Sequence, residues 1–332
     1  MPETAATCWV ITDGAAGNER QALALAGRLG LTTRVWQLEP APPWSWFAPR
    51  LLAGARAALP AAQRAQFVPP WPAVAIGCGR SAALFTRALR RWSDGRTFTV
   101  QVLDPRIAPA EYDLVVAPRH DRLQGANVLN PLGSLNPIDA AWLADGKAAF
   151  PDLAELPAPR RAVLFGASHR EVAIDTRYCV SLIEALARQH ERSGGSFLVS
   201  TSRRTPRPLV DYLRSAFARF PGLFWGGADD GPNPYAGLLA HAQAIFVTPD
   251  SVNMLSEACA VGVPVFTWLP QPAKGKLGRL HQALIDSGHL QLLGQPGRDE
   301  RIAPLRETEA IAAEVLRRWQ ASRRLPDPER IA

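Results

Sequence analysis

The segment from Thr248 to Pro264, TPDSVNMLSEACAVGVP, carries residues suited to holding a diphosphate. Asp250 or Ser251 can cap a helix that begins directly after an expected strand. The N-terminus of such a helix offers unpaired N–H groups and partial positive charge, which suit phosphate oxygens. Glu257 lies six residues after Ser251, roughly 9 Å along a helix axis, which matches the distance from a diphosphate to its ribose. A capped helix with a solvated glutamate is the alternative.

Loops after two other expected strands add phosphate-binding chemistry. In GASHREVAID, Gly166 and Ser168 let backbone N–H groups approach a ligand oxygen. STSRRTPRP carries two guanidinium groups directly after its strand, and arginine suits phosphate through paired hydrogen bonds. A connecting turn and a solvated basic turn are the alternatives. The candidate phosphate-binding residues of this basic loop are Ser202, Arg203, Arg204 and Thr205. Lys274 is a further candidate, because it is expected near the same edge of the sheet.

The first half opens with ITDGAAGNERQ, a strand followed by a glycine turn and a helix start. Gly14 and Gly17 let a ligand approach the backbone. The Asp13 carboxylate can act as a base, and Gln21 can hydrogen-bond a sugar. The segment matches neither G-x-G-x-x-G nor a P-loop, which disfavours ordinary dinucleotide or ATP binding. A plain strand-to-helix turn is the alternative.

Two more strand ends belong to this first half. AIGCGRSAAL places Gly79 and Arg80 at one of them. LVVAPRHD places His120 beside Asp121 at the other. A histidine beside an aspartate can serve as a general base near neutral pH, although such pairs are often structural. His120 and Asp13 are therefore the catalytic candidates.

Short apolar runs alternate with longer helical patterns, which predicts an α/β fold with parallel sheets. We expect two Rossmann-like domains with a cleft between them, and ligands beyond the carboxyl ends of the strands. The proline-rich FPDLAELPAPR at 150–160 is a candidate linker. The predicted parts are a first domain (1–150), a second domain (151–305) and a C-terminal helix (306–332) that packs back on the first domain.

Composition narrows the function classes. The net charge of +7 and the pI of 9.7 suit nucleic acid, an anionic membrane surface or acidic substrates. No Lys/Arg run exceeds two residues, so nucleic acid is disfavoured as a partner. The four isolated cysteines are typical of buried free thiols in a reducing cytoplasm and have no metal-binding spacing. No apolar run is long enough for a membrane span, which predicts a cytoplasmic protein, soluble or peripheral at the inner face of the membrane.

The segment PPWSWFAPRLLAGARAAL, residues 42–59, bears on membrane association. It combines Trp44, Trp46 and Phe47 with Arg50 and Arg56. Aromatic residues flanked by basic ones suit a membrane interface or a lipid-linked acceptor. Burial against the core of the domain is the alternative, and a helix is expected over 49–58.

Several segments together resemble the bacterial relatives of the plant mitochondrial-fission (elongate-mitochondria) family, whose members are similar to GT-B glycosyltransferases. The most specific pieces are DSVNMLSEA and SRRTP, with WVITDGAAGNERQ, VAIGCGRSAA and YDLVVAPRHD in the same order. The resemblance covers nearly the whole chain.

This resemblance implies a metal-independent glycosyltransferase without a cofactor, using a nucleoside-diphosphate sugar donor of the UDP type. Glu257, preceded by Ser256, stands where related transferases contact the nucleotide ribose, and Asp250 and Ser251 would border the phosphates. The resemblance also implies that the second domain (151–305) holds the nucleotide sugar and that the first domain (1–150) receives the acceptor. The acceptor-side candidates are then Gly14, Gly17, Gln21, Gly79 and Arg80. The segment 42–59 suits an acceptor that is lipid-linked or at a membrane surface. Plant members of the family are associated with recruiting a dynamin-related protein, so a non-catalytic peripheral adaptor is the alternative.

Overall fold

The protein is described by a computed structural model over residues 6–295 and 303–324. The chain divides into two compact units, Met1–Pro137 with Glu307–Ala332 (unit 1) and Ile138–Arg306 (unit 2). Each unit is built on its own six-stranded parallel sheet. The division lies at Pro137, before the boundary of 150 predicted from sequence, because α5 (Ala140–Ala149) packs against α8 (Tyr235–His241) of unit 2.

Unit 1 has the strand order β2-β1-β3-β4-β5-β6, and every neighbouring pair is parallel. Its strands are β1 (Thr7–Thr12), β2 (Thr32–Gln37), β3 (Val74–Cys78), β4 (Phe98–Val102), β5 (Leu114–Val116) and β6 (Val128–Leu129). Its helices are α1 (Ala16–Ala26), α2 (Trp44–Phe47), α3 (Ala61–Arg64), α4 (Arg80–Trp92), α11 (Thr308–Arg324) and the 3-10 turns η1 (Pro109–Glu111) and η2 (Arg119–Asp121).

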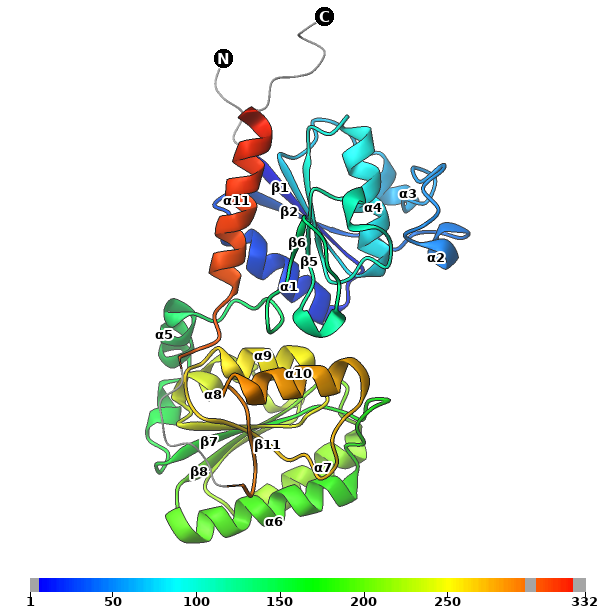
Figure 1. Ribbon diagram of the computed structural model, residues 1–332. Helices are drawn as coiled ribbons and strands as arrows, with labels where there is room; N and C mark the ends of the chain where they lie inside the picture. The colour runs from blue at the N-terminus through cyan, green and yellow to red at the C-terminus, as the bar shows by residue number, and fades with distance from the viewer. Residues whose placement is uncertain (1–5, 296–302, 325–332) are drawn as a thin grey trace, which may run out of the picture. The chain divides into compact units, whose positions relative to one another are not determined.

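Helices cover both faces of this sheet, so its central strands are apolar throughout. On one face, Leu25 of α1 and Val315 of α11 pack into the core with Val10 and Ile76. On the other face, α4 packs over an aromatic cluster that includes Trp9 and Phe67. Figure 1 shows α1 and α11 together on one side of the sheet and α4 on the other.

Unit 2 has the strand order β12-β11-β10-β7-β8-β9, again parallel throughout. Its strands are β7 (Arg160–Phe165), β8 (Ser196–Thr201), β9 (Gly222–Trp225), β10 (Ala244–Val247), β11 (Val265–Thr267) and β12 (Gln291–Leu292). Its other helices are α6 (Thr176–Ser193), α7 (Arg207–Phe217), α9 (Val252–Cys259), α10 (Gly275–Asp286) and the 3-10 turns η3 (Pro151–Ala154) and η4 (Ala228–Asp230).

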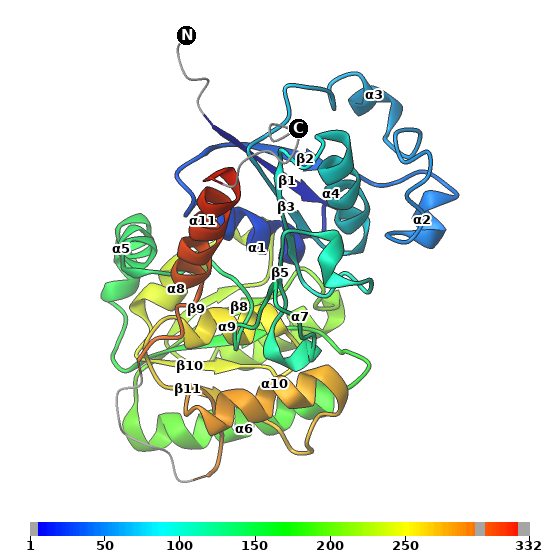
Figure 2. The same cartoon turned by 45° about the horizontal axis from the view of Figure 1, so that its top comes forward.

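The helices of unit 2 also form two layers around the sheet. α6 and α7 share one face, where Leu186 and Leu213 pack with Phe165 and Phe197. α8 and α9 lie on the opposite face, as Figures 1 and 2 show. Crossover geometry explains the split: α6 and α7 lead outward from β7 to β9, whereas α8 and α9 lead back across the sheet through β10 to β11.

Several elements depart from the sequence-based expectations. The helix predicted over 49–58 does not form; turns follow α2 there, because the Trp44 indole N–H donates to the Ala53 carbonyl (2.8 Å) and folds the chain back. FPDLAELPAPR carries η3, and Leu153 packs into a small core of unit 2 with Leu198 and Leu238. The helices α5, α8 and α10 and the two-residue strands β6 and β12 were not predicted.

All four cysteines are free and buried, as expected. Burial raises the pKa of the Cys8, Cys179 and Cys259 thiols to about 12, so these side chains are uncharged packing groups. Among the described residues, none of the helices combines the length and apolar character that crossing a bilayer requires.

Candidate functional site

The strand order of each unit reverses at one point, and two of the candidate loops of each unit lie there. In unit 2 the reversal falls between β7 and β10, whose carboxyl ends lead into Gly166 and Thr248. In unit 1 it falls between β1 and β3, whose carboxyl ends lead into Asp13 and Gly79. Ligands of open α/β sheets bind at such points, because neighbouring loops turn to opposite faces and leave a crevice.

Asp250 ties together the loops that follow three neighbouring strands of unit 2. Its carboxylate accepts hydrogen bonds from the Thr248 hydroxyl (2.6 Å) and from the backbone N–H of Ala167 (3.0 Å). The Arg204 guanidinium, from the loop after β8, lies 3.4 Å from the same carboxylate. Gly166 is required here, because a Cβ at this position would overlap both Asp250 oxygens. The three loops are therefore held in one arrangement without a ligand.

Asp250 is buried, and its burial raises the pKa of the carboxyl above its ordinary value. The hydrogen bonds from Thr248 and Ala167 and the charge of Arg204 oppose this shift only in part. Arg204 itself is 57% exposed, so most of its guanidinium faces solvent beside the strand ends. Asp250 organises the loops, and Arg204 is the group at this place that a ligand can reach.

Helix α9 begins at the same edge of the sheet. Ser251 is its N-cap, and the Ser251 hydroxyl accepts from the Met254 N–H (3.4 Å), as one of the two predicted caps. Glu257 lies farther along α9 and is only 2% exposed, so it is not a solvated glutamate. The Tyr235 phenol, at the start of α8, donates a 2.6 Å hydrogen bond to Oε2 of Glu257. A buried carboxylate thus lies behind a capped helix N-terminus.

Of the other residues predicted to bind the nucleotide sugar, some hold the fold together and some are accessible to a ligand. Thr205 is buried and donates to the Gly166 carbonyl (2.7 Å), so it joins the β7 and β8 loops. Ser168 accepts from the Ile174 N–H (2.9 Å) and closes its own loop. Ser256 is buried, and its hydroxyl donates to the Val252 carbonyl within α9. Arg203 and Lys274 are exposed.

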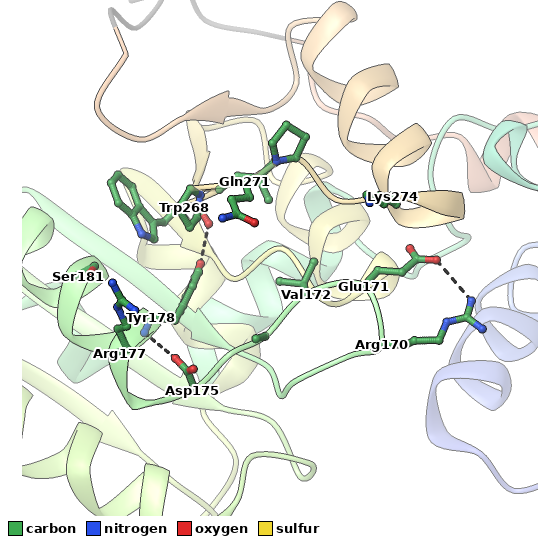
Figure 3. A pocket seen from close by; sticks show the side chains of 14 residues that line it. Arg170, Glu171, Val172, Asp175, Arg177, Tyr178, Ser181, Trp268, Gln271 and Lys274 are labelled. Carbon is green, nitrogen blue, oxygen red and sulfur yellow. Dashed lines mark hydrogen bonds and ion pairs between the residues drawn. The ribbon is translucent and has the colours of Figure 1, made fainter.

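A cavity of about 650 Å³ lies in unit 2 between the start of α6 and the loop after β11 (Figure 3). Its volume is in the range of small-molecule sites. The Tyr178 hydroxyl donates to the Trp268 carbonyl (2.8 Å) and joins the two walls. Arg170, Arg177 and Lys274 contribute positive charge. Glu257 does not line this cavity, so the two features are separate places in unit 2.

The acidic side chains of the cavity are already engaged in the fold. Asp175 is the N-cap of α6 and accepts from the Tyr178 N–H (2.8 Å). Glu171 accepts from the Leu277 N–H at the start of α10 (3.2 Å) and lies 3.5 Å from Arg170. With three basic and two acidic side chains, the lining carries a formal net charge of +1.

In unit 1, Asp13 follows β1 and is half-buried. Its carboxylate accepts from the Ala15 N–H (3.1 Å) and from the Asn18 amide (3.2 Å). The β3 loop comes close, since a Cβ on Gly79 would lie 3.1 Å from Asp13 Oδ2. Gly14 has a φ of +76° and open space at its Cβ position. Asp13 is thus ordered but reachable.

His120 lies elsewhere in the unit, in η2 after β5. It is 7% exposed, and its Nε2 lies 3.9 Å from the Asp121 carboxylate. β5 is three strands from β1 in the sheet, about 14 Å at ordinary strand spacing. Unit 1 therefore does not bring His120 and Asp13 into one catalytic pair.

The remaining acceptor-side candidates have structural roles. Arg80 donates to the carbonyls of Trp46 (2.7 Å) and Ala48 (2.8 Å), so its guanidinium is hydrogen-bonded to the loop that carries these residues. Gln21 is buried in α1 and donates to the Gly17 carbonyl (3.4 Å). Neither interaction was predicted from sequence.

Sequence reasoning missed Tyr235, Thr248 and His281 as parts of the site. His281 of α10 is buried, and its Nε2 lies 2.7 Å from the Pro249 carbonyl. Burial lowers the pKa of His281. Tyr235, Thr248 and His281 lie within the segments NPYAGLL, TPD and GKLGRLHQAL, and this place in the sequence is the signal that could have indicated them. Across the described chain, His, Cys, Asp and Glu side chains form no group of three or more that could hold a metal ion.

Comparison with known proteins gives matches over most of the chain. A family model described as Mitochondrial fission ELM1 matches residues 16–319. The chain is 29% identical over 280 residues to mitochondrial fission protein ELM1 of Arabidopsis thaliana, covering 76% of this chain. It spans 65% of the length of that plant protein. It is also 24% identical over 313 residues to the uncharacterized protein RP120 of Rickettsia prowazekii, covering 79% of this chain and 83% of that one.

Two solved structures resemble the whole chain. One is the complex of S. aureus MnaA with UDP, with a TM-score of 0.51, 12% identity, and coverage of 98% of this chain and 89% of the other. The other is UDP-GlcNAc 2-epimerase of Methanocaldococcus jannaschii, with a TM-score of 0.51, 13% identity, and coverage of 93% and 92%. At such identities the likeness concerns the fold alone. The predicted fold class, two Rossmann-like α/β units of the GT-B type, is confirmed.

Proposed function

The chain belongs to the mitochondrial fission ELM1 family, and from this premise we propose that it is a metal-independent glycosyltransferase that uses a nucleoside-diphosphate sugar. The GT-B type of fold supports a nucleotide site in unit 2. UDP is the first nucleotide to test, because the MnaA structure of similar fold contains it.

Glu257 is the observation that carries the proposal. A glutamate is rarely buried without a partner, and this one lies behind the N-terminus of α9 with a 2.6 Å hydrogen bond from Tyr235. Its helix starts at the topological reversal of the sheet. We propose that Glu257 accepts hydrogen bonds from the ribose hydroxyls while the diphosphate lies at the start of α9 beside Ser251.

The departing diphosphate needs positive charge that is present before the reaction. The N–H groups and dipole of α9 supply part of it. The exposed arginines Arg203 and Arg204 supply more, and Asp250 holds Arg204 near the strand ends. In the proposed reaction, an acceptor hydroxyl loses its proton to a base and its oxygen bonds the anomeric carbon. As this bond forms, the bond from that carbon to the diphosphate oxygen breaks, and the nucleoside diphosphate leaves with the electron pair of the broken bond.

Asp13 is the better candidate for the base in unit 1. It is half-buried at the reversal between β1 and β3, beside the open turn at Gly14. His120 is the second candidate, although it is 7% exposed. Transfer activity that survives both Asp13→Asn and His120→Asn would contradict these assignments.

The test begins with a thermal-shift screen of UDP, other nucleoside diphosphates and UDP-sugars. We expect UDP to raise the unfolding temperature of the protein. Glu257→Gln is expected to weaken the affinity for UDP at least about tenfold, because a hydrogen bond to the carboxylate is lost. Glu184→Gln, on the exposed face of α6, is the matched control. The proposal fails if no nucleoside diphosphate binds. If Arg177→Ala abolishes binding and Glu257→Gln does not, the nucleotide occupies the cavity of Figure 3 instead.

A second candidate function is a non-catalytic adaptor. The relation to the plant mitochondrial fission protein favours it. An adaptor that keeps the fold can bind UDP without consuming a UDP-sugar. Donor turnover, measured as UDP release with and without a cell extract as acceptor source, separates the two: release above background supports the enzyme, and its absence despite tight UDP binding supports the adaptor.

A further inference from the structure

Residues 42–59 form an excursion from unit 1, here called the aromatic arm, which extends beyond α4 in Figures 1 and 2. Its tip carries two neighbouring aromatic side chains in solvent, Trp46 at 68% and Phe47 at 57% exposure. Every other exposed large hydrophobic side chain of the described residues is at most 42% exposed. Adjacent exposed Trp and Phe side chains are costly in water and mark a surface that meets a partner.

The base of the arm is packed, so the exposure is not a result of a loose loop. Trp44 and Leu52 pack against the core cluster that contains Trp9 and Phe67. The Trp44 indole N–H donates to the Ala53 carbonyl (2.8 Å). The aromatic residues of the arm therefore have two different environments, one packed and one exposed, and the sequence did not show this difference. Trp44 secures the base, whereas Trp46 and Phe47 face outward.

Two arginines of α4 fix the position of the tip. Arg80 donates to the backbone carbonyls of Ser45 (3.3 Å), Trp46 (2.7 Å) and Ala48 (2.8 Å). Arg87 donates to the carbonyls of Pro49 (3.1 Å) and Arg50 (3.2 Å). The fold therefore holds Trp46 and Phe47 in one exposed arrangement, and a partner need not order them on binding.

The charge around the arm is predominantly positive. Residues 40–93 contain seven arginines and no aspartate, glutamate or lysine. Glu111 and Asp113 approach from outside this stretch, and they pair with Arg87 and Arg90 of α4. Arg50 points its guanidinium to the Arg106 carbonyl (3.3 Å), which brings a further arginine to the same region. The surroundings of the exposed aromatic pair are cationic.

We propose that the aromatic arm is a membrane anchor, in which Trp46 and Phe47 enter the headgroup region of an anionic bilayer. Tryptophan and phenylalanine favour this interface, and flanking arginines are attracted to acidic lipid headgroups. The cationic surroundings and the lack of acidic residues in 40–93 select an anionic surface over a neutral one. This role does not depend on nucleotide binding in unit 2.

Vesicle flotation of the full chain tests the anchor. We expect binding to vesicles of equal parts phosphatidylcholine and phosphatidylglycerol, little binding to pure phosphatidylcholine, and release at high salt. The double variant Trp46→Ser/Phe47→Ser is expected to lose about tenfold or more of the binding. The control Leu23→Ser/Val35→Ser, which removes exposed apolar side chains elsewhere in unit 1, is expected to bind as the unchanged protein does. Equal loss in both variants, or no binding at all, overturns the proposal.

A second readout does not depend on a destabilising change. Lipids brominated in their acyl chains quench tryptophans that enter the bilayer. We expect quenching in the unchanged protein and a clear loss of it in Trp46→Phe, which keeps an aromatic ring for insertion. Unaltered quenching in Trp46→Phe contradicts the assignment. The alternative is that the arm binds a second copy of the chain, and sedimentation velocity tests it. If the unchanged chain self-associates and Trp46→Ser/Phe47→Ser is monomeric, the arm is a contact between copies and the membrane proposal is wrong.

Discussion

The phenolic oxygen of Tyr235 lies 2.6 Å from Oε2 of Glu257, and this hydrogen bond joins the start of α8 to α9 inside unit 2. Both helices lie on the same face of the sheet, because both belong to crossovers that lead from β9 back towards β11. The pair stabilises the packing of the two helices and also belongs to the proposed nucleotide site. It holds a buried carboxylate in one orientation behind the first turn of α9.

Removing the Tyr235 hydroxyl tests the structural part of this pair. Tyr235→Phe is expected to lower the free energy of unfolding by about 1–3 kcal/mol, because a charged acceptor loses a hydrogen bond inside the protein. Urea denaturation measures it. Tyr212→Phe, on α7, is the matched control and is expected to change stability by less than about 0.5 kcal/mol. Equal effects of the two changes would contradict the role given to Tyr235.

Gly166 is expected to tolerate no side chain. In Gly166→Ala the added methyl group overlaps both oxygens of Asp250, so the β7 and β10 loops must move apart. We expect a loss of about 2–4 kcal/mol in stability. The nucleotide response in the thermal-shift assay should also weaken. A variant with unchanged stability would mean that Asp250 can turn away at little cost.

The buried His281 predicts a loss of stability in acid. Its pKa in the folded state lies below its ordinary value of 6.5, so the unfolded chain binds more protons as pH falls below that value. Stability is therefore present above pH 6.5 and is lost as the pH falls towards the lowered pKa. His281→Gln is expected to flatten this dependence, whereas His169→Gln, at an exposed position, is expected to keep it. Denaturation at a series of pH values measures the difference.

Arg80 is expected to control the mobility of the aromatic arm. Arg80→Met keeps much of the side-chain volume but removes the hydrogen bonds to the carbonyls of Ser45, Trp46 and Ala48. Trypsin should then cleave faster after Arg50, while overall stability falls by about 1–3 kcal/mol. Arg64→Met, which removes a brace to the Ala57 and Leu59 carbonyls, serves for comparison. The same cleavage rate in the unchanged chain and Arg80→Met would show that Arg80 does not brace the tip.

Short apolar runs predicted most strands of the fold, whereas the two-residue strands β6 and β12 were missed. β1, β4 and β8 are short apolar runs that end in turn residues, and such runs are informative because strands buried on both faces must be apolar throughout. Helices with a long amphipathic period, such as α4 and α6, were equally clear. α5, α8 and α10 were missed, and the expected helix over 49–58 is a series of turns, because tertiary contacts of Trp44 outweigh local helix preference.

By itself, the sequence determined the α/β class, the loops that follow the strands, and a cap for α9 at Asp250 or Ser251, of which the structure selects Ser251. These follow from local rules of periodicity, turn chemistry and capping. Only the tertiary structure decided which loop residues are buried supports, such as Asp250 and Thr205, and which remain accessible, such as Arg203 and Arg204. It also paired Glu257 with Tyr235 and separated Trp44 from Trp46. Burial and pairing depend on strand order, and strand order joins residues far apart in the chain that no local pattern relates.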